Sequence, residues 1–318
     1  MNDIRAPRAG HTIHAQHQHL SWDNSRPPAL TIAPGETVEF KDIDATCGQL
    51  TAKSTVADIR TLDFSRVNPI AGPIFVDGAE PGDALKVTLV EMTPSGWAWT
   101  AIVPGFGLLA EDFPEPALNL WSYEKGFKAP AAYGPGGRVP LKPFCGTIGV
   151  VPAENGSHST IPPHSAGGNM DIRDLTIGVD LYLPVKVKGA LFSIGDTHAA
   201  QGDGEVCGTA IESPMSVACK FDLIKDANLR FPRFVTHGPV ARHLDGKGYE
   251  VTTGINPDLM QAAQDSVRGM IDRLAELQGL SAENAYMLCS VCADLRISEI
   301  VDRPNWVVSC YFPRLVFD

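Results

Sequence analysis

The densest group of side chains that can do chemistry lies in residues 195–205, Gly-Asp-Thr-His-Ala-Ala-Gln-Gly-Asp-Gly-Glu. Asp196 and His198 are two residues apart, so on an extended segment both side chains point to the same face. Two later glycines permit a sharp reversal, which can bring Glu205 back toward them. One imidazole with two or three carboxylates suits zinc, manganese or a similar divalent ion. The alternative is an acidic hairpin that only ends a strand, since Asp-Gly is a common turn pair.

A second polar segment, Gly-Gly-Asn-Met-Asp, occupies residues 167–171. Its two glycines can place the amide of Asn169 and the carboxylate of Asp171 in a pocket. The same residues are also typical of an Asx-turn that opens a strand. The segment alone favours the turn, and the two alternatives stay open at this point.

Two further features carry residues that bind metals or act as nucleophiles. The N-terminal histidines are irregularly spaced, and such a tract can bind metal, so their role is left open; they are His11, His14, His17 and His19. Cys145 has a nucleophilic thiol, but Cys is among the most buried residue types and no base is identifiable beside it. We therefore expect Cys145 to be a small core residue.

The seven cysteines are scattered along the chain. Cys289 and Cys292 form a C-x-x-C without a second pair, which does not support a structural zinc site. At helical spacing they are most simply two small residues that face the core. In a chain of this length without a secretory signal, free thiols are favoured over a disulfide scaffold.

Composition limits the classes of protein to consider. The chain has 318 residues, of which 44% are apolar, enough to bury a sizeable core. With 26 Lys and Arg against 37 Asp and Glu, the net charge of −11 lacks the basic footprint of a nucleic-acid binder. No apolar run approaches the roughly 18 residues of a membrane span, and the first twenty residues contain no apolar core of a signal peptide. We expect a cytoplasmic protein with neither nucleic-acid nor membrane partners.

The elements that must position these residues are mainly short strands. Alternating apolar and polar residues follow Pro-Gly turns at 37–40 and 85–89, and they recur at 185–188 ahead of the apolar run 190–194. Many short strands bounded by Pro and Gly predict a β-sandwich or barrel. We divide the chain into a β-rich region at 1–165 and a second β-rich region at 166–318 that carries the site motif.

A pair of helices is predicted at about residues 257–292, as a small α-containing insertion near the C-terminus. Asn256 can cap the first helix, Gly279 can stop it, and Ser281 can cap the second. The apolar residues of the first helix follow helical spacing; they are Met260, Ala263, Val267, Met270, Ile271, Leu274 and Leu277.

The chain resembles the acetamidase/formamidase family of amide hydrolases along nearly its whole length. The most specific match is residues 189–208, Gly-Ala-Leu-Phe-Ser-Ile-Gly-Asp-Thr-His-Ala-Ala-Gln-Gly-Asp-Gly-Glu-Val-Cys-Gly. Shorter matches are residues 19–23, 72–83, 104–107, 167–171, 285–290 and 294–298. The resemblance implies a β-sandwich and barrel-like core with an α-containing insertion, hydrolysis of short linear amides and a metal at the site.

The resemblance adds Asn169 and Asp171 to the candidate site. We expect Asp196, His198 and either Asp171 or Glu205 to hold a divalent ion, zinc first, with manganese or calcium as alternatives. The remaining carboxylate would carry the proton, and Asn169 or a backbone N–H of a glycine-rich loop would orient the amide substrate. We also expect a homo-oligomer, such as a dimer. Two other functions stay open: acyl transfer by Cys145, and a non-catalytic β-sandwich that binds a small ligand with structural calcium.

Overall fold

The computed structural model describes residues 10–134 and 136–317, and its architecture is mainly β, as the sequence predicts. The first of two large sheets has six strands in the order β1-β5-β17-β7-β15-β18. Its strands are β1 (His11–Ile13), β5 (Thr37–Ile43), β7 (Ala84–Pro94), β15 (Asp180–Pro184), β17 (Met215–Ile224) and β18 (Arg233–Val235).

The second large sheet contains the strands that carry the site motif. Its order is β14-β12-β16-β6-β2, and β4 pairs with β6. The strands are β2 (Gln18–His19), β4 (Leu30–Ile32), β6 (Ile70–Val76), β12 (Phe144–Val150), β14 (Gly167–Asn169) and β16 (Phe192–His198). All seven residues of β16 are buried, so the motif sits on a fixed central strand.

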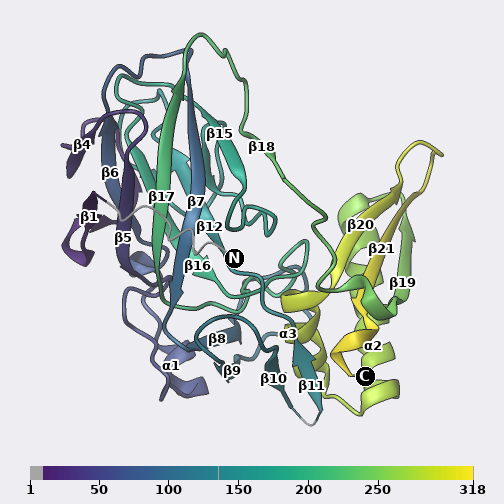
Figure 1. The fold of residues 1–318 in the computed structure, drawn as a ribbon. Coiled ribbons are helices and arrows are strands. Elements are labelled where there is room, and N and C mark those ends of the chain that lie inside the picture. Colours follow the sequence, from purple (N-terminus) through teal and green to yellow (C-terminus); the bar gives the residue numbers. More distant parts are fainter. Residues whose placement is uncertain (1–9, 135, 318) are drawn as a thin grey trace, which may run out of the picture.

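The two large sheets pack face to face around one apolar core. Phe192 of the second sheet contacts two rings of the first, with centroid distances of 5.9 Å to Phe40 and 4.9 Å to Phe221. Figure 1 shows β17 and β7 of the first sheet in front of β12 and β16. Both regions of the chain, divided at residue 165, contribute strands to each sheet.

Shorter elements surround this sandwich. Three two-stranded pairs are β8 (Trp97–Ile102) with β9 (Ala117–Ser122), β10 (Ala131–Tyr133) with β11 (Gly137–Val139), and β3 (Ser21–Trp22) with β13 (His158–Ser159). The short helix α1 (Val56–Arg60) is followed by a 3-10 turn at Phe64–Arg66.

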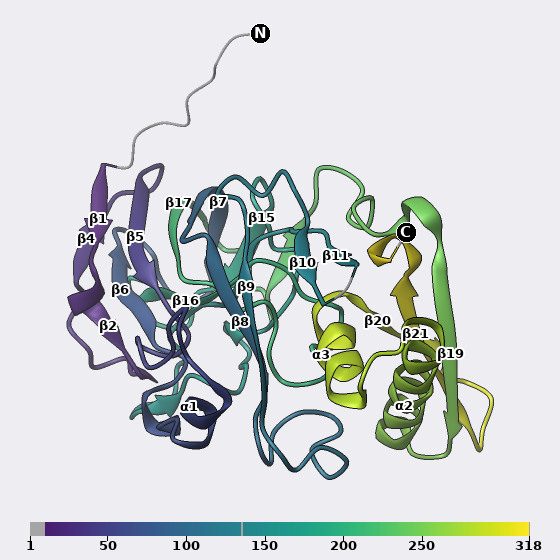
Figure 2. The same ribbon diagram turned by 90° about the horizontal axis from the view of Figure 1, so that it is seen from below.

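The C-terminal part forms an α/β unit beside the sandwich. It contains α2 (Leu259–Gln278), α3 (Ala282–Cys292) and a three-stranded sheet of β19 (Tyr249–Asn256), β21 (Trp306–Pro313) and β20 (Asp294–Glu299). Helix α3 lies between the sandwich and α2 (Figure 1 and Figure 2). Helical spacing and capping residues predicted the helical pair, but no sequence pattern predicted the sheet on which α2 packs. No helix in the described ranges is both long enough and apolar enough to cross a membrane.

Two local expectations are wrong. Residues 185–188 form no strand but an irregular segment that leads into a turn at 188–189. The reason is that β15 ends at Pro184 opposite Ala84, the first residue of its neighbour β7, so no strand remains to pair with them. Asp258, not Asn256, caps α2, its carboxylate accepting the Gln261 N–H at 3.0 Å. Of the seven apolar residues at helical spacing, Met260 and Leu277 lie at the ends of α2 and are exposed in this chain. The stop at Gly279 and the cap at Ser281 are as predicted.

Candidate active site

A row of paired residues at the end of β16 forms the floor of the candidate site. His198 is directly opposite Phe144 on one side and Glu212 on the other, and Glu212 is in turn opposite Trp99. Directly opposed residues of antiparallel strands point their side chains to the same face. The row Trp99, Glu212, His198, Phe144 therefore places a carboxylate next to the imidazole, although Glu212 belongs to no long strand.

The His198 ring is fixed in orientation and in tautomer. It is fully buried, with the Phe144 ring edge-on at 4.9 Å. Its Nδ1 lies 3.0 Å from Oε1 of Gln201, and Nε2 of Gln201 donates to the Asp171 carbonyl at 2.7 Å. Because the Gln201 amide is held this way, its oxygen accepts from Nδ1–H. The free lone pair of neutral His198 is thus on Nε2, the arrangement typical of a metal-binding histidine.

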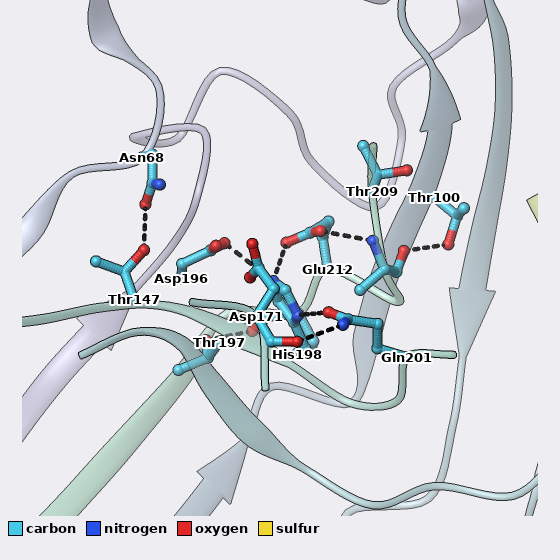
Figure 3. A network of polar contacts seen from close by, with 12 residues as sticks. Asn68, Thr100, Thr147, Asp171, Asp196, Thr197, His198, Gln201, Thr209 and Glu212 are labelled. Carbon is cyan, nitrogen blue, oxygen red and sulfur yellow. Dashed lines mark hydrogen bonds and ion pairs between the residues drawn. The ribbon is translucent and has the colours of Figure 1, made fainter. Parts of the chain in front are cut away.

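The carboxylates of Asp196, Asp171 and Glu212 gather around His198 (Figure 3). Nε2 of His198 lies 3.2 Å from Oδ1 of Asp196 and 3.2 Å from Oε2 of Glu212. In the described part of the chain, three buried atoms of this group lack a hydrogen-bond partner: Asp171 Oδ1, His198 Nε2 and Glu212 Oε2. Donor atoms that share a tetrahedral ion at about 2.0–2.1 Å are about 3.3–3.4 Å apart. The spacing and the unpaired atoms fit a shared cation.

Glu205 joins the same group from the loop after β16. Within residues 10–134 and 136–317, the metal-ligating side chains that come within 4.8 Å of one another form two groups, Asp171 with Asp196 and His198, and His198 with Glu205 and Glu212. His198 is common to both groups. The structure therefore brings together all four residues predicted as ligands and adds Glu212.

The backbone of this site is strained and closely packed. Asp171, Asp196 and Glu205 have φ angles of 48°, 54° and 42°, in the left-handed region that non-glycine residues seldom adopt. Such conformations cost on the order of 1–3 kcal/mol each and cluster at functional sites. Opposite them, Gly146 leaves essential room, since a Cβ there would lie 2.4 Å from Asp171 Oδ1 and 2.8 Å from Asp196 Oδ2.

The charges in the site are out of balance. Burial and the negative charge of Asp196 raise the pKa of Asp171 to about 7. Burial, reinforced by the Asp171 carboxylate, raises the pKa of Glu205 well above its usual value, and burial also raises the pKa of Glu212. Burial would lower the pKa of His198, but Glu212 and Asp196 outweigh it and hold that pKa well above its usual value. Four carboxylates around one imidazole favour a bound cation.

The four carboxylates line a cavity of about 420 Å³. Asn169 lines the same cavity, and its Oδ1 accepts from Thr147 Oγ1 at 2.5 Å and from Asn68 Nδ2 at 3.1 Å. Since its oxygen is engaged, Asn169 presents its amide nitrogen as a donor to the cavity. The remaining wall is largely apolar and includes Trp99 and Phe106.

The other sequence candidates lie elsewhere. Cys145 is 1% exposed, packs in the core and does not line the cavity, and burial raises the pKa of its thiol well above the usual value. The N-terminal histidines contribute to neither ligand group: His11 contacts Glu36 at 3.3 Å, and His19 is buried with Nδ1 2.9 Å from the Ser21 carbonyl. All seven cysteines are free.

Sequence reasoning missed Glu212 and Gly146. The available signal for Glu212 was a lone carboxylate in the otherwise uncharged stretch 206–219. A charged residue inside such a stretch is expected to be paired or to bind a cation. Gly146 gave no signal, because its importance depends on the strand that lies beside it.

Comparison with known proteins identifies similar chains. A model of the Acetamidase/Formamidase family matches residues 8–157 and 153–318. The formamidase of Methylophilus methylotrophus is 27% identical, over 94% of this chain and 89% of that protein. The acetamidase of Mycolicibacterium smegmatis is 30% identical, over 65% and 66% respectively.

Solved structures match over nearly the whole chain. A gamma lactamase from Delftia acidovorans has a TM-score of 0.87 and 27% identity, covering 95% of this chain and 90% of that one. An acetamidase from Bacillus halodurans has a TM-score of 0.66 and 30% identity, covering 95% and 96%.

Proposed function

The chain belongs to the acetamidase/formamidase family, and from this premise we propose that it is a metal-dependent amidase that hydrolyses short amides to a carboxylate and ammonia. The relatives are named for formamide, acetamide and a γ-lactam. These three names share cleavage of a carbon–nitrogen amide bond by water. The observation that carries metal dependence is the convergence of unpaired Asp171 Oδ1, His198 Nε2 and Glu212 Oε2 in one buried place.

His198, Asp196, Asp171 and Glu212 would hold the ion. The imidazole in this donor set favours zinc or manganese, since calcium prefers six to eight oxygen ligands. When bound, such an ion lowers the pKa of water from 15.7 to about 7 and polarises a carbonyl. Gln201 keeps the His198 lone pair directed at the site through its bond to Nδ1.

Glu205 is the candidate proton carrier. Its side chain is part-exposed in the cavity, as that of Asp171 is, whereas Asp196 and Glu212 are buried. Asp171 differs from Glu205 in having a buried oxygen without a hydrogen-bond partner, which suits Asp171 to the ligand role. In amide hydrolysis, water adds to the carbonyl carbon, the carbon–nitrogen bond breaks, and the nitrogen leaves with one more proton. A carboxylate that takes the proton from water and gives it to the nitrogen serves both steps. The raised pKa of Glu205 suits it to hold that proton between the steps.

Asn169 is the candidate that orients the substrate. Its amide nitrogen can donate to the carbonyl oxygen of the amide, because its own oxygen is held by Thr147. A bound substrate that covers the apolar wall would exclude water from the carboxylates, and this would strengthen hydrogen bonds and charge interactions inside the cavity.

Ammonia release from formamide and acetamide tests the proposal. The protein should hydrolyse one or both, lose the activity with a chelator and regain it with zinc or manganese. Cys145→Ser should keep most of the activity, because that thiol is buried away from the cavity. Activity that survives complete metal removal, or that disappears in Cys145→Ser with the fold intact, would overturn the metal mechanism.

A further inference from the structure

The cavity above the carboxylates is much larger than the smallest amides need. Its volume of about 420 Å³ lies within the ~300–1,000 Å³ range of sites that enclose drug-sized ligands. Formamide has three non-hydrogen atoms and acetamide has four. A molecule of that size at the carboxylates would leave most of the cavity wall without a contact.

The wall combines a tight polar cluster with apolar side chains. Its polar part consists of the four carboxylates, which lie close together, and of Thr46, Asn68, Asn169 and Thr209. The rest is built mainly from apolar side chains of segments far apart in the sequence, among them Leu62, Phe64, Val67, Trp99, Phe106 and Ile161. A cavity with one cluster of charged groups and a largely apolar remainder is suited to a ligand with one polar head and an apolar body.

Large apolar side chains also stand exposed on this wall. Phe64 is 48% exposed, Phe106 is 44% exposed and Ile161 is 38% exposed, and all three line the cavity. They come from the turn after α1, the loop after β8 and the loop after β13. Scattered exposed apolar residues need no explanation, but three that converge on one cavity indicate a surface that a ligand covers.

We propose that the preferred substrates are amides whose acyl group is a sizeable apolar chain or ring, with the amide at the carboxylates and the apolar group against Phe64, Phe106 and Ile161. This inference rests on the proposed amidase function. Binding energy from the apolar group then holds the carbonyl in place for the reaction at the carboxylates.

A series of primary amides measures this preference with a constant leaving group. The zinc- or manganese-loaded protein is assayed for ammonia release from formamide, acetamide, hexanamide and benzamide. Acetamide and hexanamide have alkyl-substituted carbonyls of similar reactivity, so their kcat/KM ratio reports the pocket. Each buried methylene corresponds to about fourfold in this ratio, and we expect hexanamide to exceed acetamide by at least about tenfold.

Alanine variants of the wall separate contact with the acyl group from general damage. Phe64→Ala and Phe106→Ala should each lower the hexanamide-to-acetamide ratio by about fivefold or more, because they remove the apolar surface that the chain contacts. The matched control is Phe231→Ala, a phenylalanine that is 58% exposed and does not line the cavity. This variant should leave the ratio unchanged.

The outcomes distinguish this inference from the amidase proposal. A wild-type ratio of one or below, or a ratio that neither wall variant changes, overturns the preference for apolar amides while hydrolysis of acetamide upholds the amidase. No ammonia from any of the four amides, with metal bound, overturns both.

Discussion

Glu212 and His198 are cross-strand neighbours at the centre of the site, with Oε2 of Glu212 3.2 Å from Nε2 of His198. The other carboxylate oxygen of Glu212 accepts the Ala210 N–H at 2.8 Å. One oxygen is thus fixed by the backbone while the other points at the imidazole without a hydrogen bond. Two rigidly held, buried donor atoms without a hydrogen-bond partner are the atoms that a bound cation would coordinate.

Gly146→Ala tests whether this packing is required. The new Cβ would lie 2.4 Å from Asp171 Oδ1 and 2.9 Å from His198 Cε1, so both side chains must move. We expect a loss of metal affinity and at least a tenfold loss of amide hydrolysis, since misplaced catalytic groups cost rates of that order or more. The control is Gly246→Ala, where a Cβ meets nothing within 4 Å. Normal metal content and activity in Gly146→Ala would contradict the close packing.

Glu205→Gln and Asp196→Asn should fail in different ways. If Glu205 carries the proton, its variant keeps the metal and loses about 10²–10⁴-fold in turnover, the usual contribution of a general base. Asp196→Asn should lose metal and activity together, and excess metal should restore some turnover. Two measurements on each variant, metal content by elemental analysis and the rate of ammonia release, distinguish the loss of a proton carrier from the loss of a ligand. A metal-free Glu205→Gln would make Glu205 a ligand and transfer the proton role to another carboxylate.

Much of the site was predictable from short-range spacing. Asp196 and His198 share one buried strand, and the loop that returns Glu205 is only a few residues long. Glu212 was not predictable in this way, because its place depends on bridges to His198 and to Trp99 on another strand. Gly146 is likewise important only through the side chains of Asp171, Asp196 and His198, which lie far from it in the sequence.

The fold shows the same division between local and long-range information. The alternation of apolar and polar residues correctly predicted strands at 37–40 and 85–89. Each of these segments has a partner strand on both sides, which satisfies its backbone hydrogen bonds. It failed at 185–188, which lie opposite the residues that precede the first residue of the partner strand β7. Helical spacing located α2 and α3, but not the exposure of the end residues Met260 and Leu277.

Leu274→Ala tests the attachment of α2 to its sheet. Leu274 is 1% exposed, and replacing a fully buried leucine by alanine costs about 2–5 kcal/mol. The matched control is Leu277→Ala in the same helix, where the side chain is 43% exposed and the expected change is below about 1 kcal/mol. Denaturant unfolding measures both. Equal effects of the two variants would contradict the observed orientation of the helix.

His19 should make the protein less stable in mild acid. Burial, with a smaller contribution from Arg26, lowers the pKa of His19 from 6.5 to about 4. Because the unfolded chain binds the proton more readily, stability is full above about pH 6.5 and falls as the pH drops toward 4. In His19→Gln the free energy of unfolding should decrease less between pH 7 and pH 5, by roughly 1–2 kcal/mol. The matched control is His14→Gln, at an exposed histidine. If His19→Gln has the same pH dependence of stability as the wild type, His19 is not the group that destabilises the protein in mild acid.

Anomalous diffraction from crystals grown with zinc or manganese tests the central claim most directly, because it locates the ion without reference to activity. We predict one strong peak per chain in bonding distance of His198 Nε2 and of carboxylate oxygens from Asp171, Asp196 and Glu212. A protein that hydrolyses amides but shows no peak there, or shows its only peak elsewhere, would contradict the account.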